Sequence, residues 1–211
     1  MGVAMAVLTE LEAAVGEAVD RRIAASEALA QEAEHVAHAC YDMAVRFHRG
    51  GRLIVFGNGG AGTDANHIAV EFVHPVIVGK RALPALALTN DLATVTGVAG
   101  KDGFGEIFAH QIRHLAEPPD IALGLSSDGR CDNVLRGLQA ARDLGLLTVA
   151  FTGGRGGEID TSQVADHTLV AQSADPAIVT EVHTTAYHIL WELVHVFFEQ
   201  PGVLEGLEVT R

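Results

Sequence analysis

The sequence predicts a doubly wound α/β fold, in which helices flank a mainly parallel, five-stranded sheet and an N-terminal helical extension precedes it. Short apolar runs rich in branched residues alternate with longer segments of helical periodicity, as expected for strands buried on both faces. A glycine-rich turn follows the first run and a polar turn follows the third, where such folds bind their ligands. The 211 residues, 48% of them hydrophobic, suffice for one sizeable core.

We expect three segments along the chain: N-terminal helices used for oligomerisation at 1–49, a ligand-binding domain at 50–200 and a C-terminal tail at 201–211. The first segment is rich in Ala and Glu, lacks Pro and carries apolar residues at helical spacing. It predicts two helices broken near Ala25 and Ser26, with Ser26 as the N-cap of the second. The apolar stripe of the first helix needs a surface to cover, which favours packing on a neighbouring subunit.

The remaining elements follow in alternation. The first strand is apolar and bounded by glycines, and the double proline at 118–119 ends a helix because proline lacks an N–H donor and fixes φ. We expect strands at 53–56, 82–89, 121–125, 147–151 and 167–171, helices opening at 90–94 and covering 111–115, 133–144 and 177–199, and a glycine-punctuated loop at 97–108 that carries Lys101 and Asp102.

Composition excludes several classes of function. With 14 Lys and Arg against 27 Asp and Glu, the formal charge of −13 argues against binding nucleic acid or an anionic membrane through a broad basic face. The two cysteines, Cys40 and Cys131, lie far apart and form neither a metal motif nor a disulfide framework. We find no signal peptide and no segment of membrane-spanning length, so we expect a soluble, cytoplasmic protein.

The first turn and its helix carry the chemistry. The glycines at 57–62 let several backbone N–H groups point at one anion, but their spacing matches neither the dinucleotide fingerprint nor a P-loop, so we expect no nucleotide cofactor. His67 and Glu71 are four residues apart and therefore share one helical face. A His and a Glu at this spacing are more often an exposed pair on a solvated helix face. The apolar neighbours Ile68 and Phe72 favour a mostly buried helix instead.

Several motifs together resemble the sugar isomerase (SIS) family, in particular its phosphoheptose isomerases. The resemblance covers nearly the whole chain and implies the flavodoxin-like SIS fold. The motifs are Gly-Asn-Gly-Gly at 57–60, Asp64-Ala-x-His67-x-x-x-Glu71, Leu-Pro-Ala-Leu-Ala-Leu-Thr at 83–89, Leu-Gly-Leu-Ser-Ser at 123–127, Val-Ala-Phe-Thr-Gly at 149–153 and Glu181-Val-His183 through His188.

The resemblance implies an aldose–ketose isomerase that converts sedoheptulose 7-phosphate to heptose 7-phosphate through an enediol. Glu71 would be the catalytic base and His188 the partner acid, with His67 orienting them or binding metal. His67, Glu71 and His188 offer zinc three ordinary ligands and an open position, which allows zinc without requiring it. His183 and His195, which lie among apolar residues, are expected to be satisfied core histidines.

The resemblance also implies how the substrate is held. Relatives assemble as tetramers, so we expect a homotetramer with sites near subunit interfaces and a small phosphosugar as the partner. The residues expected to bind the substrate are Asn58, Gly59, Gly60, Asp102, Ser126, Ser127, Asp128, Arg130 and Thr180.

Four positions depart from the family pattern. Ala61, Asp128 and Cys131 stand where serines are usual, and Thr180 replaces a glutamine. An ionised Asp128 beside a phosphate costs on the order of a few kcal/mol even at an effective dielectric near 20. Three explanations stay open: Asp128 caps its own helix while Arg130 attracts the phosphate, the substrate carries a hydroxyl or amine there, or the site is vestigial.

These departures keep alternative functions open. One is a non-catalytic SIS module that binds a phosphosugar or acts as a regulatory scaffold, and another is an isomerase of a modified sugar. The presence of His188 together with Glu71 favours an enzyme, since a scaffold would be free to lose either. Asp128 and Thr180 favour altered or lost activity.

Overall fold

A single parallel sheet forms the centre of the protein, and its strand order is β2-β1-β3-β4-β5. The computed structural model describes residues 2–200 and 202–204, so most of the tail expected at 201–211 lies outside the described residues. The five parallel strands and the helices that flank them confirm the predicted fold class. The strands are β1 (Leu53–Gly57), β2 (Ala85–Ala87), β3 (Ile121–Leu125), β4 (Leu147–Gly153) and β5 (His167–Ala171).

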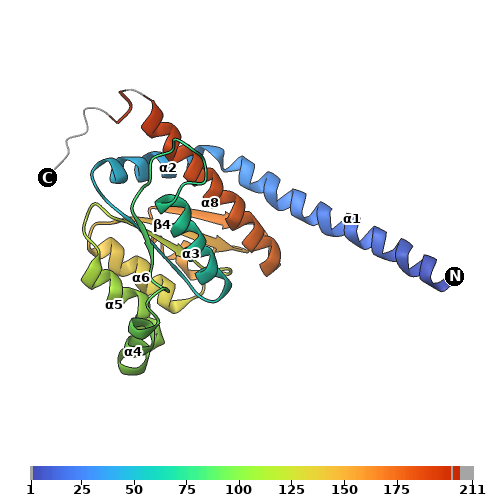
Figure 1. Ribbon diagram of the computed structural model, residues 1–211. Helices are drawn as coiled ribbons and strands as arrows, with labels where there is room; N and C mark the ends of the chain where they lie inside the picture. Colours follow the sequence, from blue (N-terminus) through green and yellow to red (C-terminus); the bar gives the residue numbers. More distant parts are fainter. Residues whose placement is uncertain (1, 201, 205–211) are drawn as a thin grey trace.

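Helices cover both faces of the sheet (Figure 1). Leu53 and Val55 of β1 point into a core shared with α2, α3 and α8, whereas Ile54 and Phe56 point into a second core shared with α4, α5 and α6. The helices are α1 (Gly2–Gln31), α2 (Ala33–His48), α3 (Gly60–Val73), α4 (Leu92–Asp102), α5 (Ile107–Leu115), α6 (Asp132–Asp143), α7 (Gly157–Thr161) and α8 (Pro176–Glu199), with a 3₁₀ turn at Phe104–Glu106.

The strand order reverses at β1, which fixes where a ligand can bind. Leu53 pairs with Ala85 of β2 on one side and with Ile121 of β3 on the other. The loops that leave β1 and β3 therefore diverge above the same edge of the sheet, the place where doubly wound folds open a crevice. The glycine turn and the polar turn noted in the sequence are these two loops.

The N-terminal helix is longer than expected. The predicted break at Ala25 and Ser26 is wrong, because α1 runs without interruption to Gln31. Ser26 does not cap a helix; its hydroxyl donates to the carbonyl of Arg22 inside α1, at 3.0 Å. Most of α1 projects away from the domain, and Leu11, Val15 and other apolar side chains of its stripe are exposed (Figure 1).

The loop expected at 97–108 is largely helical, which is a second correction. Asp91 caps α4 by accepting hydrogen bonds from the N–H and the hydroxyl of Thr94, at 3.1 and 2.6 Å. The helix continues through Gly97 and ends at Asp102, and Gly103 follows it with a φ of 94°, which suits glycine. The strand expected at 82–89 shortens to β2, and the short helix α7 was not predicted.

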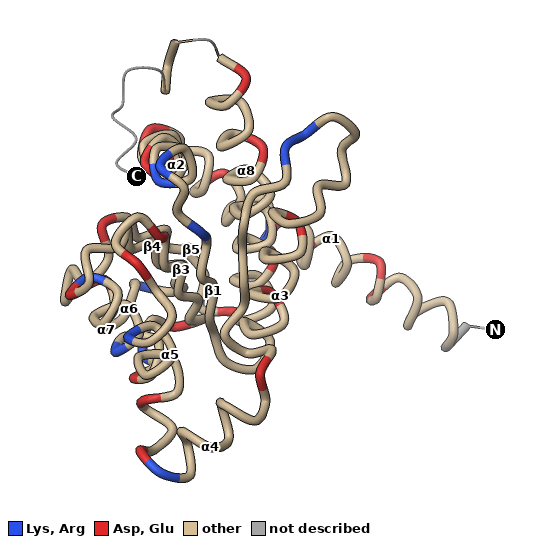
Figure 2. The backbone as a smooth tube through the Cα atoms, turned by 60° about the vertical axis from the view of Figure 1, so that its left-hand side comes forward, with Lys and Arg blue, Asp and Glu red and all other residues tan. Residues whose placement is uncertain are grey.

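Charge is distributed as the composition suggested. Acidic residues recur along helices and loops, and the basic residues do not gather into a continuous stripe in the described chain (Figure 2). Within that part of the chain, none of the helices combines the length and apolar character that crossing a membrane requires.

Candidate active site

The glycine turn after β1 brings the backbone close to helix α3. A Cβ on Gly57 would lie 2.9 Å from the carbonyl oxygen of Ala61, and Gly59 has a φ of 55°, so both positions require glycine. Asn58 exchanges two side-chain amide hydrogen bonds with Asn133, at 2.7 and 2.8 Å. These bonds hold the turn against the start of α6.

Three titratable side chains converge where α3 crosses α8. Nε2 of His67 lies 3.3 Å from Oε1 of Glu71, and Nε2 of His188 lies 3.6 Å from the same oxygen. Potential ligand atoms of the three residues all lie within 4.8 Å of one another. Helices far apart in sequence thus build the predicted His–Glu–His cluster.

The cluster is open on its imidazole side and covered on its carboxylate side. The side chains of His67 and His188 are 47% and 46% exposed, whereas that of Glu71 is 12% exposed. The two imidazoles are therefore accessible from solvent, whereas the carboxylate of Glu71 is partly desolvated. The indole N–H of Trp191 donates to the backbone carbonyl of Glu71 at 3.0 Å, which ties α8 to α3 at the level of the cluster.

Tyr187 completes the surroundings of the cluster. Its hydroxyl lies 2.7 Å from Nδ1 of His67, and burial raises the pKa of Tyr187, with the charges of Asp64 and Glu71 adding to the rise. Neither Tyr187 nor Trp191 was identified from the sequence, because both reach α3 across 120 residues of chain.

Asp128 accepts hydrogen bonds from other residues of the loop that follows β3. Oδ1 of Asp128 accepts from the N–H of Arg130 at 3.0 Å and from the hydroxyl of Ser126 at 3.4 Å. The capping explanation is wrong, because Cys131 occupies the N-cap position of α6 and the cap receives no side-chain hydrogen bond. Asp128 instead forms a local turn inside the loop.

This loop lines a cleft of about 790 Å³ beyond β3 and β4. Ser127, Asp128 and Arg130 contribute one wall and Arg155 stands in the loop after β4. The two loops touch tightly, since a Cβ on Gly129 would lie 1.9 Å from the carbonyl oxygen of Gly156. Neither arginine makes an ion pair or a side-chain hydrogen bond within the described chain, and Arg155 was not singled out from the sequence.

Two predicted substrate residues lie apart from the cluster. Asp102 ends α4, where its carboxylate is exposed and lies 3.9 Å from Nδ1 of His110. Thr180 is exposed two helical turns before His188, and its carbonyl accepts from the hydroxyl of Thr184 at 2.9 Å. Among the described residues, Asp102 is not part of the group of side chains that could hold a metal ion.

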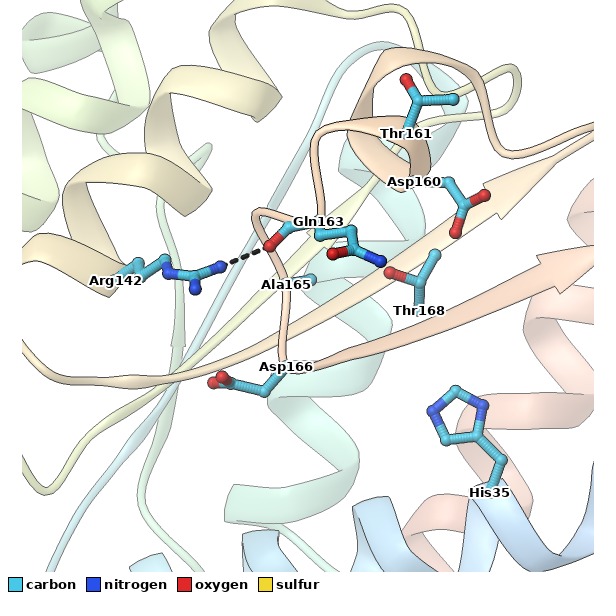
Figure 3. Close-up of a pocket in the computed structure, with 8 residues that line it drawn as sticks. All are labelled: His35, Arg142, Asp160, Thr161, Gln163, Ala165, Asp166 and Thr168. Carbon is cyan, nitrogen blue, oxygen red and sulfur yellow. Dashed lines mark hydrogen bonds between the residues drawn. The ribbon is translucent and has the colours of Figure 1, made fainter.

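A second pocket lies between α6, α7, β5 and α2 (Figure 3). Its polar groups hydrogen-bond within the fold: Arg142 donates to the carbonyl of Gln163, and the carboxylate of Asp166 accepts from the N–H and the hydroxyl of Thr148, both at 2.9 Å.

His183 and His195 are buried core histidines, as expected, and each ring is hydrogen-bonded to a backbone carbonyl oxygen.

The fold, together with a cluster of two imidazoles and a carboxylate between α3 and α8, is that of a sugar-isomerase type of α/β protein. The SIS domain family profile matches residues 19–153. The chain belongs to the SIS domain family.

Curated and solved relatives point to one branch of that family. The chain is 39% identical to the phosphoheptose isomerase of Aquifex aeolicus over 84% of this chain and 91% of the relative, and 42% identical to that of Solidesulfovibrio magneticus over 79% and 81%. A phosphoheptose isomerase structure from Francisella tularensis superimposes with a TM-score of 0.81 at 30% identity, covering 86% of this chain and 96% of that one. One from Neisseria gonorrhoeae gives 0.80 at 26%, covering 87% and 98%.

Proposed function

We propose that this protein is an aldose–ketose isomerase that converts sedoheptulose 7-phosphate to heptose 7-phosphate. The observation that carries the proposal is the convergence of two imidazoles on one carboxylate oxygen, from helices on the same face of the sheet. The names of the curated and structural relatives support the same reaction class and substrate.

The reaction moves a carbonyl from C2 to C1. Glu71 removes a proton from C1, the electron pair of that C–H bond forms the enediol double bond, and His188 protonates the oxygen at C2. Glu71 then returns the proton to C2 while the hydroxyl at C1 gives its proton to His188 and becomes the aldehyde, which restores the starting protonation of both groups. Donors near the two oxygens stabilise the charge that develops on the enediol, and His67 orients the other two groups.

The donor set fits a zinc ion. Two imidazole nitrogens and a carboxylate oxygen, which lie within 4.8 Å of one another here, are ligand types that catalytic zinc sites use. His67, Glu71 and His188 would hold the ion. When bound, it would supply a Lewis acid that polarises the carbonyl.

The distal phosphate is assigned to the loops beyond the strands. Backbone N–H groups at Asn58, Gly59 and Gly60 and the hydroxyls of Ser126 and Ser127 are its donors in this proposal, and Arg130 replaces attraction lost with the missing serines. Asp102 and Thr180 would contact the sugar. Both residues stand apart from the cluster within one subunit. The proposal therefore includes a homotetramer whose sites lie near subunit interfaces. It also places the protein in the cytoplasm.

Replacing Glu71 by glutamine tests the proposal. The amide keeps the shape of the side chain but cannot take up a proton, so we expect Glu71→Gln to lose at least about 100-fold in kcat while still binding the sugar phosphate. Turnover is followed by formation of the aldose and binding by calorimetry, with Glu192→Gln, an exposed position on α8, as control. Turnover that survives in Glu71→Gln would end the case for this base.

A second candidate function follows from the phosphate loop. Asp128 places a carboxylate, and Thr180 a short hydroxyl, where the family pattern that the sequence resembles has serine and glutamine. These two departures favour a modified sugar or a non-catalytic sugar-binding role. A substrate with a hydroxyl or amine at its distal end would hydrogen-bond Asp128 directly. Wild-type protein is tested for binding and turnover of sedoheptulose and sedoheptulose 7-phosphate. Turnover of sedoheptulose alone supports the modified sugar, and binding without turnover supports the non-catalytic role.

A further inference from the structure

The ring of His67 makes one hydrogen bond within the described chain, and its partner is the hydroxyl of Tyr187 at 2.7 Å from Nδ1. The opposite nitrogen, Nε2, faces Oε1 of Glu71 at 3.3 Å, where the pair is in contact without forming a well-directed hydrogen bond. Since the side chain of His67 is 47% exposed, packing alone leaves the ring free to turn. The contact with Tyr187 therefore decides which nitrogen faces Glu71 and His188.

Tyr187 is well placed to hold this contact. It is 2% exposed, and its ring meets that of His67 edge to face, with centroids 5.4 Å apart. It directly precedes His188 on α8, so the same helical turn carries the hydroxyl and the second imidazole of the cluster. A buried ring has few rotamers, and its hydroxyl is consequently fixed in space.

A hydroxyl is also the right group chemically. A neutral imidazole carries a proton on one nitrogen only, and a tyrosine hydroxyl can both donate and accept. The hydroxyl donates to Nδ1 when the ring proton is on Nε2, and accepts from Nδ1–H when Nε2 presents its lone pair to a cation. A backbone carbonyl or a carboxylate would serve only the second state.

We propose that Tyr187 is a positioning residue that holds His67 with Nε2 directed into the cluster. Its hydroxyl donates to Nδ1 in the metal-free protein, where Nε2 carries the ring proton, and accepts from Nδ1–H when Nε2 binds a cation. The inference rests on the proposed use of His67 at this site. It assigns to Tyr187 the part that partners of metal-binding and catalytic histidines commonly play, which is to fix ring orientation and tautomer.

Removing only the hydroxyl tests this role. Tyr187→Phe keeps the buried ring, and Tyr41→Phe, which removes the hydroxyl of the only other tyrosine, is the matched control. We expect Tyr187→Phe to bind zinc about 10- to 100-fold more weakly in competition with a chromophoric chelator, and Tyr41→Phe to match wild type. Equal zinc affinity in all three proteins would overturn the inference for the metal-bound state.

Nitrogen-15 NMR of metal-free protein provides a readout that needs neither zinc nor activity. Wild type should show one ring state of His67, with Nδ1 hydrogen-bonded, whereas Tyr187→Phe should give the averaged nitrogen shifts of two exchanging tautomers. Two exchanging tautomers in wild type would overturn the proposal without any variant. If the expected NMR result is obtained but wild type has no isomerase activity, the proposed function fails and the positioning role stands.

Discussion

Asp128 is one of the four positions at which the sequence departs from the family pattern that it resembles. Its carboxylate accepts hydrogen bonds from the N–H of Arg130 and the hydroxyl of Ser126, and these donors partly offset its negative charge inside the loop. These hydrogen bonds lower the electrostatic free-energy cost of placing a phosphate near Asp128. Arg130 and Arg155 line the same cleft, and neither forms an ion pair within the described chain.

Two substitutions decide what this loop binds. We expect Asp128→Ser to leave or improve affinity for sedoheptulose 7-phosphate, because a like charge disappears, and Arg130→Ala to weaken it about 10-fold, because a charge-assisted donor is lost. Calorimetric titration measures both. Arg113→Ala is the control, since that arginine pairs with Glu106 outside the cleft.

The opposite pattern would identify a different substrate. If Asp128→Ser loses the natural sugar and gains the phosphorylated one, Asp128 recognises a neutral or cationic group. If wild type and both variants all fail to bind sedoheptulose 7-phosphate, phosphate is not what the loop holds.

At the scale of elements, α8 couples the cluster to the sheet. One turn before Tyr187, His183 lies 4% exposed, and its Nε2 lies 2.9 Å from the carbonyl oxygen of Thr152 in β4. Burial lowers the pKa of His183 from its ordinary value, and the bond to Thr152 opposes part of that shift. The folded protein thus favours the neutral ring.

This shift predicts a pH dependence of stability. With the folded pKa below the unfolded value of about 6.5, the contribution of His183 is complete above that pH and is lost as pH falls below it, because the unfolded chain takes up the proton first. Urea unfolding should show a smaller loss of free energy on acidification in His183→Gln than in wild type. His74→Gln, at an exposed histidine, should follow wild type, and an unchanged slope in His183→Gln would contradict the assignment.

Elements with a strong local signal were predicted well. The five strands follow apolar runs, and the spacing of His67 and Glu71 placed both on one helix. The helix break at Ser26 and the loop at 97–108 were wrong because serine and glycine have weak local preferences, which a long Ala-rich helix and the cap at Asp91 override.

Parts of the site that depend on tertiary contact were not predicted. Asn133 pairs with Asn58 across 75 residues, and Tyr187 and Trp191 reach α3 across 120. No periodicity within either segment reports such a pair, because the partner is chosen by how α6 and α8 pack. Recognising the site from sequence therefore required the family resemblance for His188, and the structure for its neighbours.

At the scale of the whole molecule, α1 predicts assembly. Its outer half projects from the domain with Leu8, Leu11, Val15 and Val19 each about half exposed, an apolar stripe that water disfavours. We expect light scattering to give four times the subunit mass, in line with closed symmetric assembly. A stable monomer at micromolar concentration would contradict this.

Paired charge substitutions on α1 test whether the stripe forms the contact. Leu11→Glu with Val15→Glu places two charges on the stripe and should lower the measured mass. Ala13→Glu with Ala24→Glu adds the same charge on the opposite face of the helix and should leave the assembly unchanged. Equal masses for both double variants would assign the interface to another surface.

The strand order has a consequence for synthesis on the ribosome. Once β1 and β2 have emerged and paired, β3 adds to the free side of β1, β4 to β3 and β5 to β4, so the sheet grows in the order of translation. Helix α8 emerges after all five strands, and it carries His188, which joins His67 and Glu71 on the earlier helix α3. A nascent chain can therefore complete its sheet before the cluster of His67, Glu71 and His188 can form.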